Sequence, residues 1–270
     1  ATTWVSAMRR KTFPTAPLLL APLLLAACSQ WPGGPLVMVR GDAFFDQPWP
    51  SDSRTIDGRP DLSGFPREGS MPLIDTMLAE GEMLQGFGLS SPIYLRFEEP
   101  INSASVPSPH ESLDPANAMF LVDIDPHSPE RGRLVPFTTD LQDTETTWQP
   151  ENLLAVQPVL GLPLRSTTTY ALVLTRDRWG QPRLDDGGPF TDVFDPRHPS
   201  FGRYQSLGET LLQLDLNTDS IAFATVITTQ DAVGDMARIV QRMDEALGTP
   251  SLDQQLEYWW ANDIYQAWSG

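Results

Sequence analysis

Cysteine is almost absent from this 270-residue sequence, in which Cys28 is the only thiol. A single cysteine excludes an intramolecular disulfide, so the folded part of the chain must be stabilised by its hydrophobic core. Lysine is equally scarce, because Lys11 is the only one and the other strongly basic side chains are all arginines. Acidic residues outnumber basic ones by 35 to 18, which argues against nucleic acid as a partner.

Catalytic signatures are also missing. A serine hydrolase of the α/β type needs a Gly-x-Ser-x-Gly elbow, and this pattern does not occur in the sequence. The three histidines, His110, His127 and His198, lie in segments rich in Pro and Ser, where we expect solvated loop side chains and not held general bases. They are too scattered for a zinc site. No catalytic residue is therefore predicted in this chain, and whether a longer protein is an enzyme stays open.

The beginning of the chain has the three parts of a secretory signal. Basic residues at 9–11 follow Met8, an apolar stretch covers 17–25, and Leu25-Ala26-Ala27-Cys28 completes the pattern. The last four residues resemble the lipobox of bacterial lipoproteins, in which a peptidase cuts before Cys and the thiol carries diacylglycerol. The resemblance implies a signal region at 1–27 with its true start at Met8, and lipidation (palmitate and related acyl chains) at Cys28. The alternatives are a plain secreted protein or a buried N-terminal helix with an incidental cysteine.

The lipobox resemblance also implies a location. A diacylglyceryl group with a further acyl chain would anchor the chain to a membrane of the bacterial cell envelope. Ser29 after the cysteine favours the outer membrane. Cleavage would remove three basic residues and no acidic ones, leaving 15 basic against 35 acidic residues and a net charge of −20. Anionic lipid is therefore not expected to attract the mature protein, and the anchor would be its contact with the membrane.

Residues 28–69 are rich in Pro, Gly and Asp and have no hydrophobic period, which predicts an extended lead-in on a neighbouring surface. Aromatic side chains are expected to hold it there, since a disordered linker would contain fewer of them. These anchors are Phe44, Phe45, Trp49 and Phe65.

Residues 70–230 contain six short segments of strand character, separated by Pro and Gly. The pattern predicts a mainly β domain built as an antiparallel sandwich. A helix capped by Ser70 and stopped by Gly86 should precede it, and a second helix is expected within an insertion near 199–216. The expected strands lie in PIYLRFEEPI, AMFLVDID, LVPFTTDL, NLLAVQPV, TTTYALVLT and SIAFATVITT.

Residues 231–270 are expected to form a helical linker. Its apolar stripe ends before Gly248 and is expected to pack within the protein and not to bind a partner. The sequence then ends among aromatic residues, from which we expect a further C-terminal part. The stripe consists of Met236, Ile239, Val240, Met243 and Leu247.

Calcium is the metal that the sequence comes nearest to predicting. Asp123 and Asp125 follow a strand, and Asp215, Asn217 and Asp219 place oxygen side chains at alternating positions, as an EF-hand loop begins. The second segment lacks the glycine and the closing glutamate of that loop. Ordinary turn capping explains both clusters as well, and no cofactor is otherwise expected.

Two stretches resemble bacterial Ig-like domains. IYLRFEEPINSASV is similar to their first strand, and LLAVQPVLGLPLRSTTTYALVLT to a later pair, which implies that Phe97 and Tyr170 are core residues. Lipobox, lead-in, Ig-like domain and linking helix together resemble the N-terminal half of bacterial surface lipoproteins related to extracellular lipases and esterases. In those proteins an α/β-hydrolase domain follows.

This resemblance implies a lipid-anchored, non-catalytic accessory region, with a catalytic domain in cis as its partner. A stand-alone binding or adhesion lipoprotein with the same fold is the alternative. A third hypothesis is that the chain itself is an esterase, although it lacks the Gly-x-Ser-x-Gly elbow.

Overall fold

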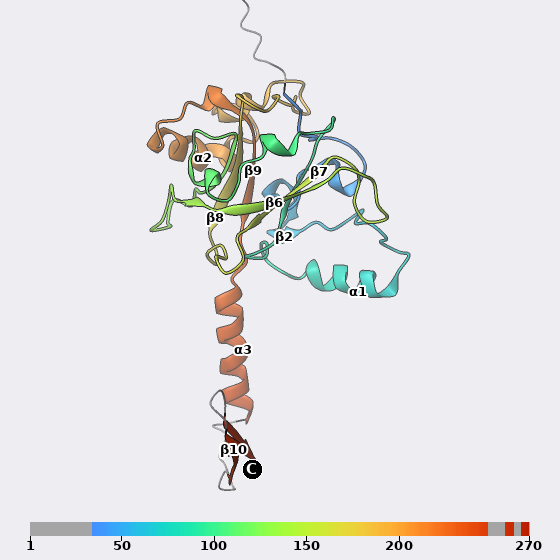
Figure 1. The fold of residues 1–270 in the computed structure, drawn as a ribbon, viewed down its shortest axis with the longest axis vertical. Helices are drawn as coiled ribbons and strands as arrows, with labels where there is room; N and C mark the ends of the chain where they lie inside the picture. The colour runs from blue at the N-terminus through green and yellow to red at the C-terminus, as the bar shows by residue number, and fades with distance from the viewer. Residues whose placement is uncertain (1–33, 248–256, 262–265, 270) are drawn as a thin grey trace, which may run out of the picture. The chain divides into compact units, whose positions relative to one another are not determined.

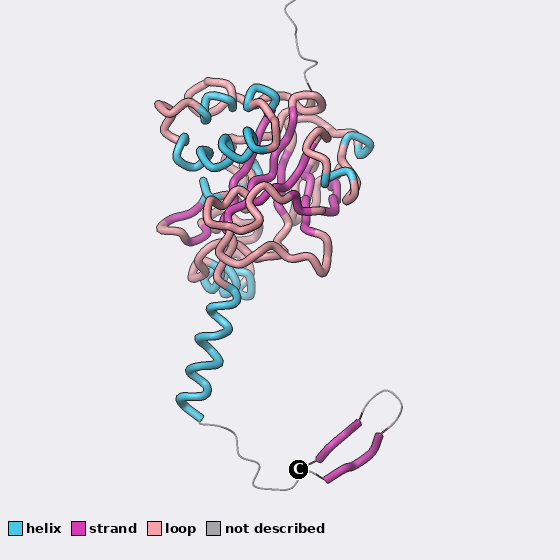
Figure 2. Tube along the Cα trace, turned by 90° about the vertical axis from the view of Figure 1, so that its left-hand side faces the viewer, coloured by secondary structure: helices cyan, strands magenta, loops and turns pink. Residues whose placement is uncertain are grey.

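A computed structural model describes residues 34–247, 257–261 and 266–269 of the chain. The leader at 1–27 and Cys28 lie outside the described residues, so signal cleavage and lipidation stay predictions. Between residues 34 and 229, strands occupy the middle and helices and loops surround them (Figures 1 and 2). The predicted mainly β fold is confirmed.

Two antiparallel sheets make up the body. In the three-stranded sheet β7 lies between β3 and β6, and the four-stranded sheet has the order β5-β4-β8-β9. The three-stranded sheet consists of β3 (Ile93–Arg96), β7 (Leu153–Pro158) and β6 (Phe137–Gln142). The four-stranded sheet consists of β5 (Leu134–Val135), β4 (Met119–Asp123), β8 (Thr169–Thr175) and β9 (Ile221–Thr228).

Both sheets contribute to one hydrophobic core. Alternation places Ile93 and Leu95 of β3 inside, while β9 is buried at seven of its eight positions. A strand buried on both faces needs a second cover. The expected insertion helix, α2 (Phe201–Gln213), supplies it together with the 3₁₀ helix η5 (Phe190–Phe194): the Tyr204 hydroxyl donates to the Ala224 carbonyl of β9 at 3.3 Å. Figure 1 shows α2 beside β9.

Proline divides one predicted strand into two. LVPFTTDL was expected as a single strand, but β5 pairs with β4 in one sheet and β6 pairs with β7 in the other, with Pro136 between them. Proline has no N–H to donate to a ladder, so pairing is interrupted at this residue. The chain therefore crosses from one sheet to the other at Pro136, as strands do at the corners of packed sheets.

The strand order differs from an immunoglobulin constant domain at one position. There the first, second, fifth and fourth strands form one sheet, and the third, sixth and seventh form the other. When the seven strands of the two main sheets are numbered in chain order, from β3 to β9, the three-stranded sheet has the order first-fifth-fourth. The four-stranded sheet has the order third-second-sixth-seventh. The second strand, β4, lies in the opposite sheet.

The lead-in packs on this body as predicted. Its aromatic anchors form a second cluster in which Phe44 and Phe45 are buried with Leu153 of β7. The Arg54 guanidinium lies over the rings of Phe44 and Trp49, 4.2 and 4.8 Å from their centroids. The elements of this region are η1 (Phe44–Asp46), η2 (Asp52–Arg54), β1 (Thr55–Ile56) and β2 (Arg59–Pro60). The remaining 3₁₀ helices are η3 (Ser103–Ser105), η4 (Glu111–Leu113) and η6 (Thr218–Ser220).

Asp52 joins the lead-in to the edge strand β9. Its carboxylate accepts hydrogen bonds from the Thr228 backbone N–H at 2.8 Å and from the Thr228 hydroxyl at 2.7 Å. Burial raises the pKa of Asp52, although the bonds to Thr228 act in the opposite direction. These bonds satisfy edge groups that would otherwise be open for pairing with another chain.

Replacing Asp52 with alanine is expected to lower the free energy of unfolding by about 1–3 kcal/mol, because two donors of Thr228 lose their acceptor. Asp52→Asn keeps one acceptor oxygen and should lose less of this free energy.

The stability of the protein should also depend on pH through Asp52. Because the pKa of Asp52 is raised in the folded state, its ionisation lowers the free energy of unfolding as the pH rises through that pKa. Asp52→Asn should remove this part of the pH dependence. Urea denaturation measures both effects. Asp42→Ala, at an exposed residue of the same segment, is the matched control, and an equal loss in that variant contradicts the account.

The helix α1 (Pro72–Gly81) differs from its prediction at both ends. Met71 is its N-cap and makes no side-chain cap, while the Ser70 hydroxyl donates to the Arg67 carbonyl. Gly86 does not stop the helix. It has a φ of +81° and lies against the backbone at 228–230, where an added Cβ would come within 2.9 Å of main-chain atoms. Close approach to β9 is thus what requires glycine here.

The C-terminal segment is helical only in its first half. The helix α3 (Ala232–Leu247) ends just before Gly248, as predicted. The strands β10 (Glu257–Ala261) and β11 (Gln266–Ser269) then pair antiparallel, so the prediction of a helical linker to residue 270 is wrong. Tyr and Trp favour extended backbone, and four of them lie in these two strands.

Candidate functional site

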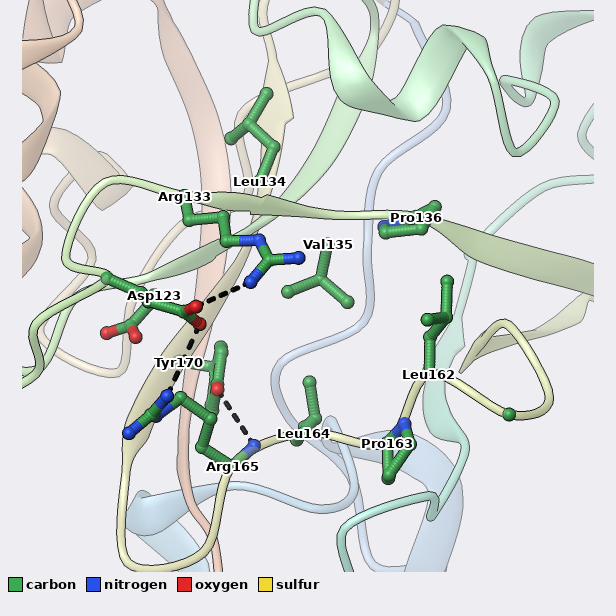
Figure 3. A pocket seen from close by; sticks show the side chains of 12 residues that line it. Asp123, Arg133, Leu134, Val135, Pro136, Leu162, Pro163, Leu164, Arg165 and Tyr170 are labelled. Carbon is green, nitrogen blue, oxygen red and sulfur yellow. Dashed lines mark hydrogen bonds and ion pairs between the residues drawn. The ribbon is translucent and has the colours of Figure 1, made fainter.

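A cavity of about 290 Å³ lies where β4 ends and the chain crosses between the sheets. One wall is the connection 124–133 together with β5, and the other is the loop 159–168 before β8 (Figure 3). Six apolar residues line it: Leu134, Val135, Pro136, Leu162, Pro163 and Leu164. Its charged and hydroxyl-bearing lining residues are Asp123, Glu130, Arg133, Arg165 and Tyr170.

Two arginines share one carboxylate in this cavity. Arg133 Nη1 lies 2.7 Å from Glu130 Oε1, and Arg165 Nη1 lies 3.6 Å from Glu130 Oε2. All three side chains are partly exposed, so the cluster is open to water and to a ligand. Sequence reasoning missed these residues, because the segment that holds Glu130 lies between two expected strands and was treated only as their connection. The available signal was the pair of arginines, Arg131 and Arg133, directly after Pro129-Glu130.

The wall at 124–133 is fixed to the helix α2. Arg131 donates from Nε to the Thr210 hydroxyl at 3.0 Å and from Nη2 to the Ser206 carbonyl at 3.1 Å, and it pairs with Glu209 at 2.9 Å. The guanidinium forms its bonds in a fixed planar geometry. The insertion helix therefore holds Glu130 and Arg133 in position.

The opposite wall is fixed by Tyr170, near the start of β8. Its side chain is buried, as the Ig-like resemblance implies, and its hydroxyl accepts a hydrogen bond from the Arg165 backbone N–H at 3.0 Å. Burial raises the pKa of Tyr170. A tyrosine that bonds to backbone five residues upstream has the geometry of the tyrosine corner of Greek-key sandwiches.

Asp123, one of the calcium candidates, lies at the base of the cavity. Its Oδ2 accepts from the Ser128 hydroxyl at 2.5 Å and its Oδ1 from the Asp125 N–H at 3.0 Å. Burial raises the pKa of Asp123 against these bonds. Asp125 accepts from the backbone N–H groups of His127 and Thr169, at 2.8 and 3.2 Å. Both carboxylates therefore cap the connection between strands.

The second calcium candidate is a turn before β9. Asp215 has a φ of +56°, and the Asn217 side chain caps η6 by accepting from the Asp219 N–H at 2.9 Å. Across the described ranges, no group of three or more His, Cys, Asp or Glu side chains is arranged to hold a metal ion. The structure thus accounts for both clusters by local capping.

The three histidines differ in how far their side chains are exposed. His110 and His127 are exposed, as predicted. The prediction is wrong for His198, whose side chain is only 12% exposed: its Nδ1 accepts from the Ser200 N–H at 3.1 Å, and its Nε2 lies 3.2 Å from Asp186 Oδ2. These contacts fix the loop before α2, and they explain His198 without a catalytic role.

Two helices present apolar faces that nothing in the described part of the chain covers. Leu73 and Met77 of α1 are 69% and 61% exposed, and five side chains of α3 are 51–70% exposed. The prediction that the α3 stripe packs within the protein is therefore wrong for the described residues. The chain after α1 and the chain before α3 meet, because Phe87 and Thr229 form a β-bridge. The exposed residues of α3 are Val233, Met236, Ile239, Val240 and Met243.

No family model matches this chain, and neither a curated protein nor a solved structure matches it significantly. Among the helices that the structure describes, none is both long enough and apolar enough to cross a bilayer.

Proposed function

We propose that this chain is the lipid-anchored, non-catalytic N-terminal accessory region of a bacterial cell-surface hydrolase of the lipase or esterase type. Cys28 carries the anchor, in the outer membrane, and a catalytic domain that follows in cis is the partner. The observation that carries the proposal is the pair of uncovered apolar faces on α1 and α3. Soluble domains rarely expose contiguous apolar surface unless it meets a partner.

The position of these faces favours a partner that follows in the same chain. Ten of the sixteen large apolar side chains that are exposed in the described part belong to 71–84 or to α3. Gly86 and Phe87, which follow the first segment, lie against the end of β9, and α3 begins shortly after that strand, as the chain continues toward its C-terminus. A domain joined through α3 would be held near this surface at a high effective concentration, so modest apolar contact would suffice for docking.

The Ig-like assignment of residues 70–230 is part of the same proposal. Seven strands in sheets of three and four, the crossing at Pro136 and the bond from the Arg165 N–H to Tyr170 support it. The place of β4 in the opposite sheet departs from the immunoglobulin constant pattern, so the proposal is a variant of that sandwich.

The natural reading frame after Gly270 tests the function directly. We expect it to encode Gly-x-Ser-x-Gly, followed by Asp and His. The full polypeptide should hydrolyse a p-nitrophenyl ester, replacement of the elbow serine by alanine should abolish turnover, and the 270-residue chain should have none. A stop codon soon after Gly270 would instead support a stand-alone binding or adhesion lipoprotein. Ester turnover by the 270-residue chain would contradict the non-catalytic assignment.

A further inference from the structure

The cavity beside Glu130 has the parts of a carboxylate site. Two guanidinium groups approach one carboxylate, at 2.7 and 3.6 Å, from opposite walls (Figure 3). Arginine pairs with carboxylates by charge-assisted hydrogen bonds of defined geometry. Glu130 therefore occupies the place that the carboxylate of a ligand would take between Arg133 and Arg165.

The cavity brings two positive side chains together in an acidic chain. Its lining holds two arginines and two acids, Asp123 and Glu130, so it is formally neutral in a chain whose net charge is −17. Asp123 is the second acid of the lining, but both of its oxygens accept hydrogen bonds from the connection at 124–133. Of the two acids, Glu130 is therefore the one that pairs with both arginines.

The rest of the lining is apolar and sets the size of the ligand. Val135 points into the cavity from the crossing strand and Leu164 from the loop, whereas Leu134 points to the opposite side of the strand (Figure 3). Pro136, Leu162 and Pro163 complete the apolar lining. About 290 Å³ is at the small end of ligand sites, which suits a short aliphatic body and not a long chain.

We propose that this cavity binds a small aliphatic monocarboxylate, with its carboxylate between Arg133 and Arg165 and its alkyl part against Val135, Pro136 and the residues at 162–164. The ligand carboxylate displaces that of Glu130, which acts as an internal competitor. The inference rests on the cavity alone and does not depend on the proposed function.

Octanoate is the probe, and 1-octanol is its neutral counterpart. Titration calorimetry on the 270-residue chain should show saturable binding of octanoate and at least tenfold weaker binding of 1-octanol. Glu130→Gln removes the competitor, so octanoate should bind it about 3- to 10-fold more tightly, a change of about 0.7–1.4 kcal/mol. Arg133→Gln and Arg165→Gln should each weaken octanoate binding about tenfold.

Arg197→Gln is the matched control, because Arg197 is an exposed arginine outside the cavity that pairs with Asp195. It should bind octanoate as the unmodified chain does. The proposal is overturned if 1-octanol binds as tightly as octanoate, if Glu130→Gln weakens binding, or if the two cavity variants behave like Arg197→Gln. It is also overturned if octanoate binds to neither the unmodified chain nor Glu130→Gln. Urea denaturation of each variant verifies that the fold is retained.

Discussion

Replacing Cys28 with alanine is expected to abolish lipid attachment and to move the protein from the membrane fraction to the soluble fraction. Cys28 is the only cysteine of the chain, so no second thiol can accept the diacylglyceryl group. Each buried CH₂ of an acyl chain contributes about 0.8 kcal/mol to membrane binding, and two or more chains anchor a protein firmly. Loss of the thiol should therefore abolish membrane attachment completely and not merely weaken it.

The measurement is incorporation of labelled palmitate by a Gram-negative bacterium that expresses the chain with its leader, followed by membrane fractionation. Ser29→Ala is the matched control, since it leaves the cysteine and the residues before it intact and should still be labelled. Label in the Cys28→Ala protein would contradict the lipobox interpretation. An unlabelled native chain would contradict it as well and would support a plain secreted protein.

The second large effect is expected from charges placed on the apolar face of α3. Met236→Glu combined with Val240→Glu adds two carboxylates to side chains that are 61% and 52% exposed. In the 270-residue chain this double change should alter the free energy of unfolding by less than about 0.5 kcal/mol, as exposed substitutions usually do. In the full polypeptide the same carboxylates would be buried against the docked domain, and an unpaired buried charge costs several kcal/mol.

Calorimetry of the full polypeptide should register this difference. Docked domains stabilise one another, so the native protein should unfold in one coupled transition and the double variant in two separate ones. Arg242→Glu, on the polar face of α3, changes the net charge by the same two units and should leave the transition coupled. The docking proposal fails if both changes have the same effect, or if neither separates the domains.

The strands and the core could be predicted because burial leaves a direct pattern in the sequence. Ile93 and Leu95 alternate with partly exposed residues, and the apolar run of β9 indicates a strand covered on both faces. Phe97 and Tyr170 are buried as the Ig-like resemblance implies. What the pattern could not specify was pairing, because Pro136 interrupts the ladder without interrupting the apolar pattern.

Local signals failed where distant contacts decide the conformation. Serine commonly caps a helix and glycine commonly ends one. Here, however, the Ser70 hydroxyl donates a hydrogen bond to the Arg67 carbonyl, and Gly86 lies against β9. His198 comes from a loop sequence, but Asp186 and the Ser200 backbone hold it in a partly buried place. The contacts of Gly86 with β9 and of His198 with Asp186 join residues that are far apart in the sequence, whereas Ser70 forms a local turn in place of a cap.

The candidate cavity was beyond sequence reasoning for the same reason. Glu130 and Arg133 are near neighbours, but Arg165 reaches them only because β4 and β8 pair and bring the two loops to one end of the sheet. The uncovered stripe of α3 was visible as an amphipathic pattern. Whether that stripe is covered depends on what packs beside it, which the sequence of the helix does not contain.

Hydrogen exchange tests the central claim, that α1 and α3 form a docking surface for a domain of the same polypeptide. Amide protection is compared between the full polypeptide and the 270-residue chain, over 73–78 and 233–246. The account predicts markedly slower exchange of both segments in the full polypeptide, with exchange of the β4 and β8 amides unchanged. Equal exchange of α1 and α3 in the two proteins would contradict it.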